Sequence, residues 1–441
     1  MMTGVSDAAL RGELTMPGDK SISHRAVMFS ALAEGDTHIT GFLNGADCLS
    51  TIQCFERLGA PIELSENATE VTVHGRGMHG LRPENGETAV LDTGNSGTTT
   101  RILSGILAGQ SFPSLLSGDA SINRRPMRRI IEPLTAMGAD IVSVNDNGCA
   151  PLHIAGSPLH GVEWTSPVAS AQVKSCILCA GLYADGVTAV KEPALSRDHT
   201  ERMLSAMGAR VKTEKLCSSD KTVSYRTEIT AAEKLTSPGI IEIPGDISSA
   251  AYFLVAGLIV PGSSILLRNV GINPTRAGIL TVLRAMGGDI TLMNRRDKTG
   301  EPSADILVRS SALHGTRICG DLIPTLIDEI PVLAVAAAAA DGDTVIADAE
   351  ELKVKESDRI AVCTENLRAM GAEVTPSEDG MTIAGGKPLH GALIRCHADH
   401  RIAMSFAVAS LIAEGSVDQD DESCVRISYP GFFRDLTSLR R

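Results

Sequence analysis

Apolar and polar residues follow one another along the chain in a pattern that repeats. Six times, an apolar run of helical length ends in a glycine, and a strand-like run usually follows. These glycines are spaced 73 to 80 residues apart, at Gly35, Gly109, Gly186, Gly262, Gly342 and Gly415. Near-equal spacing of this kind is typical of repeat proteins, in which each repeat is one supersecondary unit.

A second glycine lies within most repeats, in a Met-Gly-Ala sequence or a close variant of it. It occurs at Gly59, Gly138, Gly208, Gly287 and Gly371. Glycine just beyond a helix adopts the left-handed conformation without a Cβ penalty, so we expect both kinds of glycine to end helices. Each repeat is then predicted to contain a helix, a strand, a second helix and two further strands.

Two kinds of helix alternate in these repeats. The first kind is apolar nearly all round, as in residues 250–260 and 331–340, and must be buried on every side. The second kind carries charges, as in residues 198–206 and 357–369, and should expose one face to solvent. Six buried helices, each inside its own layers, are incompatible with a doubly wound parallel sheet.

The two halves of the chain also resemble each other. Residues 17–23 read Pro-Gly-Asp-Lys-Ser-Ile-Ser, and residues 244–250, which lie 227 positions later, read Pro-Gly-Asp-Ile-Ser-Ser-Ala. A chance likeness between Ala- and Gly-rich segments is the alternative. The near-equal repeat spacing and the length of 441 residues, which exceeds that of most single domains, favour two lobes of three repeats each.

Composition and charge narrow the function classes. The chain is 43% hydrophobic, like ordinary globular proteins, and its net charge of −13 speaks against nonspecific binding to nucleic acid or to an anionic membrane. Its apolar runs fall far short of the roughly 20 residues that cross a bilayer, and residues 1–12 contain no apolar signal region. Ten cysteines indicate reduced thiols, so we expect a cytoplasmic protein, with Cys176 and Cys179 as core residues.

An acidic protein can still bind anions if it gathers its cations in one place. The segment after Gly18 begins a buried helix and carries Lys20, Ser21 and Arg25. The free N–H groups of a helix start favour phosphate or carboxylate, and these side chains add positive charge there. The alternative is a helix capped by Asp19 or Ser21, with Lys20 in solvent. The spacing of a P-loop is absent.

Hydroxyl groups and cations recur at other expected helix starts. They lie in residues 93–101, 123–129, 170–172, 353–359 and 399–401. Each segment alone could be a solvated run of charges. Corresponding loops of a repeat array fall on one face, however, so two lobes could bring these groups around one ligand that carries several anionic groups.

Seven motifs, found in order along essentially the whole chain, resemble those of the 5-enolpyruvylshikimate-3-phosphate synthase family. They are Pro17-Gly18-Asp19-Lys20-Ser21-Ile22-Ser23-His24-Arg25, Gly94-Asn95-Ser96-Gly97-Thr98, Arg124-Arg125-Pro126-Met127, Ser170-Ala171-Gln172, Arg197-Asp198-His199-Thr200-Glu201, Lys355-Glu356-Ser357-Asp358-Arg359 and Asp399-His400-Arg401-Ile402-Ala403-Met404. The last two are the most specific. The resemblance implies an α/β fold, a two-lobed inside-out α/β barrel of six βαβαββ repeats with buried parallel helices.

The resemblance also implies where the lobes and the site lie. Residues 20–242 would form the first lobe, and residues 1–19 with 243–441 the second, with the active site in the cleft between them. The shikimate 3-phosphate contacts would be Lys20, Ser21, Arg25, Ser170, Ala171, Gln172, Arg197, Asp328 and Lys355. The phosphoenolpyruvate contacts would be Lys20, Gly97, Arg125, Gln172, Arg359 and Arg401.

The implied reaction transfers the enolpyruvyl group of phosphoenolpyruvate to the 5-hydroxyl of shikimate 3-phosphate and releases phosphate. It proceeds by addition and elimination through a tetrahedral intermediate, on the shikimate pathway to aromatic amino acids. The resemblance assigns catalysis to Lys20, to Asp328 as general base and to Glu356 as the acid that protonates the methylene carbon. Glu329 is equally available, however, and Asp328 alone could cap a helix.

Two further points of the motifs stay open. Arg124 and Arg125 are adjacent, so their roles could be exchanged. Some family members carry a lysine before the C-terminal Ser/Thr-aromatic-Pro sequence, whereas Ile427 stands at that position here. That contact is therefore absent or comes from elsewhere.

The remaining expectations concern ligands and alternatives. No metal or cofactor is expected, because no ligand cluster has metal spacing. We expect a monomer that glyphosate can inhibit, since tolerant family members can carry Ala at the position of Gly97. One alternative is the related transferase that acts on UDP-N-acetylglucosamine, but its Lys-Asn sequence is Lys20-Ser21 here, and residues 120–128 lack its cysteine. Another is a non-catalytic anion-binding repeat protein, against which Asp328 and Glu356 count.

Overall fold

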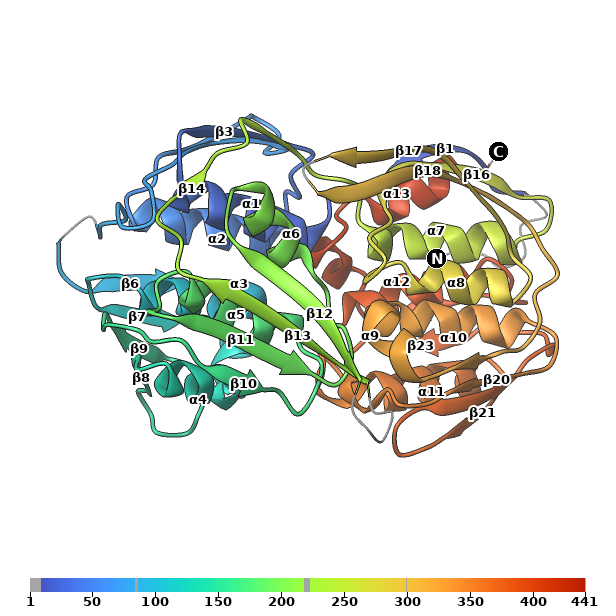
Figure 1. Ribbon diagram of the computed structural model, residues 1–441. Coiled ribbons are helices and arrows are strands. Elements are labelled where there is room, and N and C mark those ends of the chain that lie inside the picture. The colour runs from blue at the N-terminus through green and yellow to red at the C-terminus, as the bar shows by residue number, and fades with distance from the viewer. Residues whose placement is uncertain (1–8, 84–85, 218–222, 299, 441) are drawn as a thin grey trace. The chain divides into compact units, whose positions relative to one another are not determined.

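The chain forms two compact units in the computed structural model, which describes residues 9–83, 86–217, 223–298 and 300–440 (Figure 1). The first lobe comprises residues 18–243 and 297–301, and the second comprises the residues up to 17, 244–296 and those from 302 onward. The predicted boundaries lay at residues 19 and 242. Residues 297–301, at the end of β17 (Asp289–Lys298) and the start of β18 (Glu301–Arg309), were predicted to belong to the second lobe.

Three four-stranded sheets make up most of the first lobe, in the orders β15-β3-β5-β4, β6-β7-β9-β8 and β10-β11-β13-β12. In each sheet the first two strands are parallel and the other pairs are antiparallel. The strands are β3 (Asp36–Thr40), β4 (Ile62–Leu64), β5 (Glu70–His74), β6 (Ala89–Asp92), β7 (Ser114–Ser117), β8 (Asp140–Ser143), β9 (Leu152–Ala155), β10 (Glu163–Thr165), β11 (Val187–Glu192), β12 (Val211–Cys217), β13 (Val223–Thr230) and β15 (Ile240–Glu242).

The helices of the first lobe are of the two predicted kinds. Those buried nearly throughout are α1 (Lys20–Leu32), α3 (Gly97–Ala108) and α5 (Ala171–Gly181). Those that bury one side are α2 (Ala46–Arg57), α4 (Arg128–Ala136) and α6 (His199–Ala206). Cys176 and Cys179 are buried in α5, as expected, and burial raises the pKa of Cys179 to about 12.

The second lobe repeats this plan with one change. Its sheets have the orders β1-β16-β18-β17, β19-β20-β22-β21 and β23-β24. The remaining strands are β1 (Arg11–Thr15), β16 (Ser264–Gly271), β19 (Arg317–Ile318), β20 (Asp343–Ile346), β21 (Glu373–Pro376), β22 (Met381–Ala384), β23 (Leu393–Ile394) and β24 (Asp418–Gln419). The sixth repeat, which has no Met-Gly-Ala sequence, is thus reduced to two strands within the described residues.

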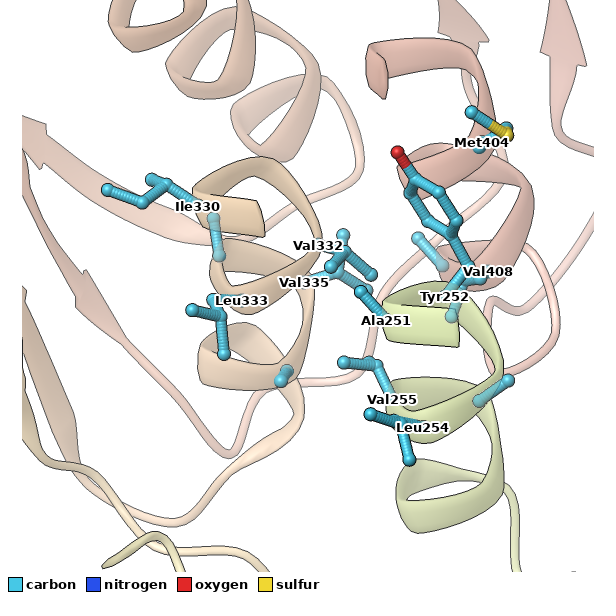
Figure 2. Packing of buried hydrophobic residues seen from close by; sticks show 14 of the residues in the cluster. Ala251, Tyr252, Leu254, Val255, Ile330, Val332, Leu333, Val335, Met404 and Val408 are labelled. Atoms are coloured by element: carbon cyan, nitrogen blue, oxygen red, sulfur yellow. The ribbon is translucent and has the colours of Figure 1, made fainter. Parts of the chain in front are cut away.

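Three apolar helices fill the core of the second lobe: α7 (Ile247–Ile259), α10 (Ile330–Ala339) and α12 (His400–Ala409). Figure 2 shows Ala251 and Val255 of α7 directed toward Val332 and Val335 of α10, and each of these side chains is at most 1% exposed. Burial of one valine stabilises the fold by roughly 1.5–3 kcal/mol relative to its exposure. Small residues on all sides of these helices let them pack closely, which explains a core that contains few aromatic residues.

The charged helices of this lobe are α8 (Gly278–Ala285) and α11 (Arg359–Ala369), and α13 (Phe432–Ser438) follows the last repeat. Residues Gly320–Ala339 form a helical stretch that is long and apolar enough, by length and composition, to cross a membrane. The stretch is divided into a 3-10 turn η2 (Gly320–Leu322), α9 (Ile323–Leu326), a second 3-10 turn η3 (Ile327–Glu329) and α10, and 72% of its most apolar window is buried. It is accordingly a core element of the second lobe.

The glycines that mark the repeats have left-handed backbones with one exception. Those in the Met-Gly-Ala sequences have φ between +81° and +97°, as predicted. Gly109 ends α3 as predicted, since it is the C-cap residue of that helix, but its φ of −92° is not the expected left-handed conformation. There a Cβ atom would lie 2.3 Å from the ring of Tyr183, so space and not backbone conformation requires the glycine.

Candidate functional site

The start of α1 holds the first group of predicted site residues. Asp19 caps the helix, because its Oδ1 accepts a hydrogen bond from Ile22 N at 2.9 Å. A Cβ atom on Gly18 would lie 1.8 Å from the carbonyl oxygen of Gly41, so only glycine fits in this turn. Lys20 is not merely solvated, since its Nζ lies 2.5 Å from Asp47 Oδ2. Asp19 therefore caps α1, and Lys20 next to it is held by an ion pair.

Arg25 ties this helix start to two others. It is buried, and its Nε donates to Thr200 Oγ1 at 2.7 Å while its Nη2 donates to Ser175 Oγ at 2.9 Å. Its Nη1 also donates to the carbonyl oxygen of Ser21 at 3.0 Å. The guanidinium thus joins α1 to the first turns of α5 and α6, where other predicted residues lie.

The starts of α3 and α5 bring a second group together. Gln172 Oε1 accepts a hydrogen bond from Arg101 Nη1 at 2.6 Å, and Gln172 Nε2 donates to Thr98 Oγ1 at 3.1 Å. A Cβ atom on Gly97 would lie 2.8 Å from Arg101 Nη1 and 3.3 Å from Arg125 Nη1. The structure therefore places Gly97, Arg125 and Gln172 around Arg101, which the sequence analysis missed.

The two adjacent arginines of the 123–129 segment differ in their contacts. Arg125 Nη2 donates to Asn95 Oδ1 at 2.7 Å, in the turn before α3. Arg124 Nε donates to the carbonyl oxygen of Ala120 within its own loop. The side chain of Arg125 therefore joins the group around Gly97.

Ser170, Ala171 and Arg197 complete the predicted residues of the first lobe. Ser170 is the N-cap residue of α5, but its side chain makes no capping hydrogen bond, and Ala171 is the first residue of that helix. Ser170 N donates to Glu192 Oε1 at 2.8 Å. Arg197 lies in the turn before α6, directly after Ser196.

The second lobe gathers its own group around Arg359, at the start of α11. The Arg359 side chain is 1% exposed, and its Nε donates to Asp399 Oδ2 at 2.8 Å. Its two other nitrogens donate to Asp328 Oδ1 at 3.2 Å and to Glu356 Oε2 at 2.7 Å. One guanidinium thus binds carboxylates from three separate segments of the chain.

Two more predicted cations lie next to Asp328. Lys355 Nζ is 3.8 Å from Asp328 Oδ1, and Arg401 Nη2 is 3.9 Å from Asp328 Oδ2. Together with Arg359, these cations surround the Asp328 carboxylate, whose negative charge offsets the repulsion among them. All five predicted residues of the second lobe therefore belong to one cluster.

The structure distinguishes Asp328 from Glu329. Glu329 is 1% exposed and hydrogen-bonds Ser248 Oγ, so it is part of the core. The Asp328 side chain is 13% exposed and lies in η3, before α10. Glu329 occupies the N-cap position of α10, but its side chain makes no capping hydrogen bond to that helix. Asp328 is therefore not a helix cap, and it is the more accessible carboxylate.

The cations of this cluster determine the protonation of its carboxylates. Burial acts to raise the pKa of Glu356, but the charge of Arg359, followed by that of His400, outweighs burial and holds that pKa below its ordinary value. The same balance between burial and Arg359 lowers the pKa of Asp399. Both side chains are consequently carboxylates at neutral pH. Among the residues that the structure describes, no group of three or more His, Cys, Asp and Glu could hold a metal ion.

Comparisons with known proteins agree over nearly the whole chain. The family model described as EPSP synthase (3-phosphoshikimate 1-carboxyvinyltransferase) matches residues 6–436. The 3-phosphoshikimate 1-carboxyvinyltransferases of Brevibacillus brevis and of a Geobacter species are 54% and 51% identical, and each alignment covers 98% of this chain and 97% of the relative. A solved structure of the EPSP synthase of Acinetobacter baumannii matches with a TM-score of 0.88 at 46% identity, covering 99% of this chain and 97% of that one.

Proposed function

The chain belongs to the EPSP synthase family, and we propose that it performs this family's reaction with the side chains gathered at the helix starts of its two lobes. It is a transferase that passes the enolpyruvyl group of phosphoenolpyruvate to shikimate 3-phosphate, in the shikimate pathway. One observation carries the assignment of residues. Motifs that are far apart in the sequence converge within each lobe, most clearly around Arg359.

The shikimate 3-phosphate contacts are assigned to both lobes. In the first lobe they are Lys20, Ser21, Arg25, Ser170, Ala171, Gln172 and Arg197, which combine cations with the free N–H groups of the α1 and α5 starts. Such groups suit a phosphate and a carboxylate. Asp328 and Lys355 of the second lobe would meet the rest of the substrate, so the proposal requires both lobes to act on the same substrates.

Phosphoenolpyruvate is assigned to Gly97, Arg125, Gln172 and Lys20 of the first lobe and to Arg359 and Arg401 of the second. Two anionic substrates repel each other when they bind side by side. Cations fixed in advance offset that repulsion and stabilise the charge of the departing phosphate. Arg101 adds a cation beside Gly97, since the two lie within contact distance.

Asp328 and Glu356 supply the proton transfers in this proposal. Asp328 takes the proton of the 5-hydroxyl while the oxygen attacks C2 of phosphoenolpyruvate, and Glu356 delivers a proton to C3. Glu356 removes a proton from C3 again when phosphate leaves the tetrahedral intermediate. Because Arg359 keeps the pKa of Glu356 low, we infer that Glu356 gains its proton when the substrate anions weaken that attraction.

Phosphate release tests the function. The protein should release phosphate when it is mixed with phosphoenolpyruvate and shikimate 3-phosphate, and not with phosphoenolpyruvate and UDP-N-acetylglucosamine. Asp328→Asn should lower kcat by about 10²–10⁴-fold with an unchanged circular dichroism spectrum. Release with the nucleotide sugar alone would assign the protein to the related transferase, and release with neither acceptor would favour a non-catalytic protein.

We also propose that glyphosate inhibits the enzyme in competition with phosphoenolpyruvate, that the chain is monomeric and that it works in the cytoplasm. Gly97 supports the first point, because the absence of a Cβ atom leaves room beside Arg101. Undiminished activity in millimolar glyphosate at low phosphoenolpyruvate would contradict it. Light scattering at assay concentrations would show whether the enzyme is a monomer.

A further inference from the structure

A buried ion cluster lies beneath the helix starts of the first lobe and takes no part in the proposed chemistry. Lys174, in the first turns of α5, is fully buried, and its Nζ lies 2.8 Å from Glu201 Oε1 and 3.1 Å from Glu192 Oε2. Burial disfavours the charged lysine, but Glu201 and Glu192 outweigh burial and hold the pKa of Lys174 above its ordinary value. The lysine therefore remains a cation inside the lobe.

One carboxylate of this cluster holds two of the predicted substrate-binding segments. Glu192 Oε1 accepts the hydrogen bond from Ser170 N, and Glu192 Oε2 accepts one from Ser196 Oγ, each at 2.8 Å. Lys174 Nζ also donates to the carbonyl oxygen of Ser196 at 3.2 Å. Since Arg197 follows Ser196, the cluster fixes the backbone on both sides of the proposed shikimate 3-phosphate contacts.

The cluster also reaches Arg25. Ser175 follows Lys174 on α5, and Thr200 precedes Glu201 on α6. Arg25 donates hydrogen bonds to both of these hydroxyl groups, which lie 2.7 Å from each other. A shift of α5 relative to α6 would therefore displace the guanidinium.

We propose that Lys174 is a positioning residue for shikimate 3-phosphate. Its ion pairs with Glu192 and Glu201 lock α5, α6 and the turn before α6 together. They thereby hold Ser170, Arg197 and Arg25 at the spacing that the substrate needs. The inference rests on the proposed function and extends it to groups that do not touch the substrate. Fixing the binding groups before the ligand arrives reduces the ordering cost of binding.

The sharpest test compares two substitutions of Glu192. Glu192→Leu removes the acceptor for Ser170 N but leaves Lys174 paired with Glu201, so the lobe should still fold. We expect the KM for shikimate 3-phosphate to rise about tenfold or more, since about 1.4 kcal/mol corresponds to a factor of ten. The KM for phosphoenolpyruvate at saturating shikimate 3-phosphate should change less than about twofold. Glu192→Gln keeps an oxygen acceptor and should restore nearly normal binding.

Lys174→Met tests the lysine directly and should also raise the KM for shikimate 3-phosphate selectively. Leu178→Ala, a buried change further along α5, is the matched control: it should lower the melting temperature without changing either KM. Lys174 would be merely structural if Lys174→Met and Glu192→Leu behaved like this control or raised both KM values equally. If Lys174→Met fails to fold, the two Glu192 variants decide.

The same experiments separate this inference from the proposed function. A wild-type enzyme that turns over, with variants that show no selective loss of shikimate 3-phosphate affinity, overturns the positioning role alone. A wild-type protein that neither releases phosphate nor binds shikimate 3-phosphate in calorimetry overturns the function and, with it, the inference.

Discussion

The helices α1 and α7 begin with the same Pro-Gly-Asp sequence and the same kind of cap, but different side chains follow. Asp19 accepts a hydrogen bond from a backbone N–H of α1, as Asp246 does from one of α7. At the 227-residue offset, Lys20 corresponds to Ile247. Both helix starts offer the same positive backbone end, but only that of α1 adds a partly exposed lysine.

The polar groups at the start of α7 interact with one another instead. Arg276 Nη2 donates to Ser248 Oγ at 2.8 Å and to Asp246 Oδ1 at 3.2 Å, and Ser248 also hydrogen-bonds Glu329. All of these groups are buried. The same backbone arrangement therefore belongs to the proposed ligand site in the first lobe and to the core in the second, depending on the side chains that surround it.

The largest contrast is expected from a matched pair of substitutions at these helix starts. Lys20→Met should lower kcat by about 10³–10⁴-fold, because a cation at the proposed site is lost. Ile247→Met should leave kcat unchanged and cost less than about 1.5 kcal/mol of stability, since it preserves apolar volume. Steady-state phosphate release and urea unfolding measure the two effects. Equal losses of activity would remove the functional distinction between α1 and α7.

The two buried arginines should differ in the opposite sense. Arg276→Met removes the cation that pairs with the buried Asp246 and Glu329 carboxylates, and should cost about 3–5 kcal/mol of unfolding free energy. Arg25→Met removes bonds to hydroxyls and a carbonyl, and should cost about 1–3 kcal/mol while raising the KM for shikimate 3-phosphate. Denaturant unfolding of both variants gives the comparison. A greater loss for Arg25→Met would contradict it.

The lobes should also respond differently to acid. Burial, followed by the charge of Lys20, lowers the pKa of His24 to about 3, and Asp47, Arg25 and Asp19 are the other charges that act on it. Between about pH 6.5 and 3 the unfolded chain takes up a proton that the folded first lobe refuses. That lobe should therefore lose up to about 1.4 kcal/mol per pH unit as the pH falls.

Asp399 contributes stability in the second lobe in a lower pH window. Its pKa is lowered, so this stability is present above about pH 4 and is lost only as the pH falls further.

Trp164, the only tryptophan, lies in β10 and reports on unfolding of the first lobe. His24→Leu should flatten the decline of its unfolding free energy between pH 6.5 and 5. An unchanged slope would show that His24 is not the responsible group.

The smallest effect is expected at the start of α3, where a substitution would crowd the proposed phosphoenolpyruvate site without removing a charge. In Gly97→Ala the new methyl group would lie 2.8 Å from Arg101 Nη1, which is too close for both to stay in place, so the end of the Arg101 side chain must shift. We expect the KM for phosphoenolpyruvate to rise roughly threefold to tenfold, by about 1 kcal/mol, and the inhibition constant of glyphosate to rise further. Arg101→Lys together with Gly97→Ala should recover part of the affinity. If Gly97→Ala left the inhibition constant of glyphosate unchanged, glyphosate would not bind beside Gly97.

Much of the fold could be predicted because its signals are local. An all-round apolar run such as that of α10 can only be buried, and the glycines of the Met-Gly-Ala sequences have the positive φ that ends a helix. The sixth repeat lacks the Met-Gly-Ala glycine, which indicated that it would be shorter, but the sequence analysis still predicted a full repeat there. Gly109 was misinterpreted because its neighbour in space, Tyr183, is 74 residues away in the sequence.

For the proposed site, the sequence motifs supplied the candidate residues but not the contacts that those residues make. Motifs identified Lys20, Arg359 and Asp328, but no local pattern indicates that Asp47 pairs with Lys20 or that Asp399 holds Arg359. These partners lie 27 and 40 residues away along the chain, on other helices. A buried ion pair depends on which helices meet, and sequence spacing alone does not supply that information.

By itself the sequence determined the repeats, the two lobes as an expectation, the buried helices and the family, because periodicity, glycine positions and motifs can all be read in one dimension. Only the tertiary structure decided that Asp328 and not Glu329 is accessible, that Lys174 is a buried cation, and that Arg25 joins three helices. The physical reason is that the energy of a charge depends on its burial and its neighbours, and both arise only when distant segments pack together.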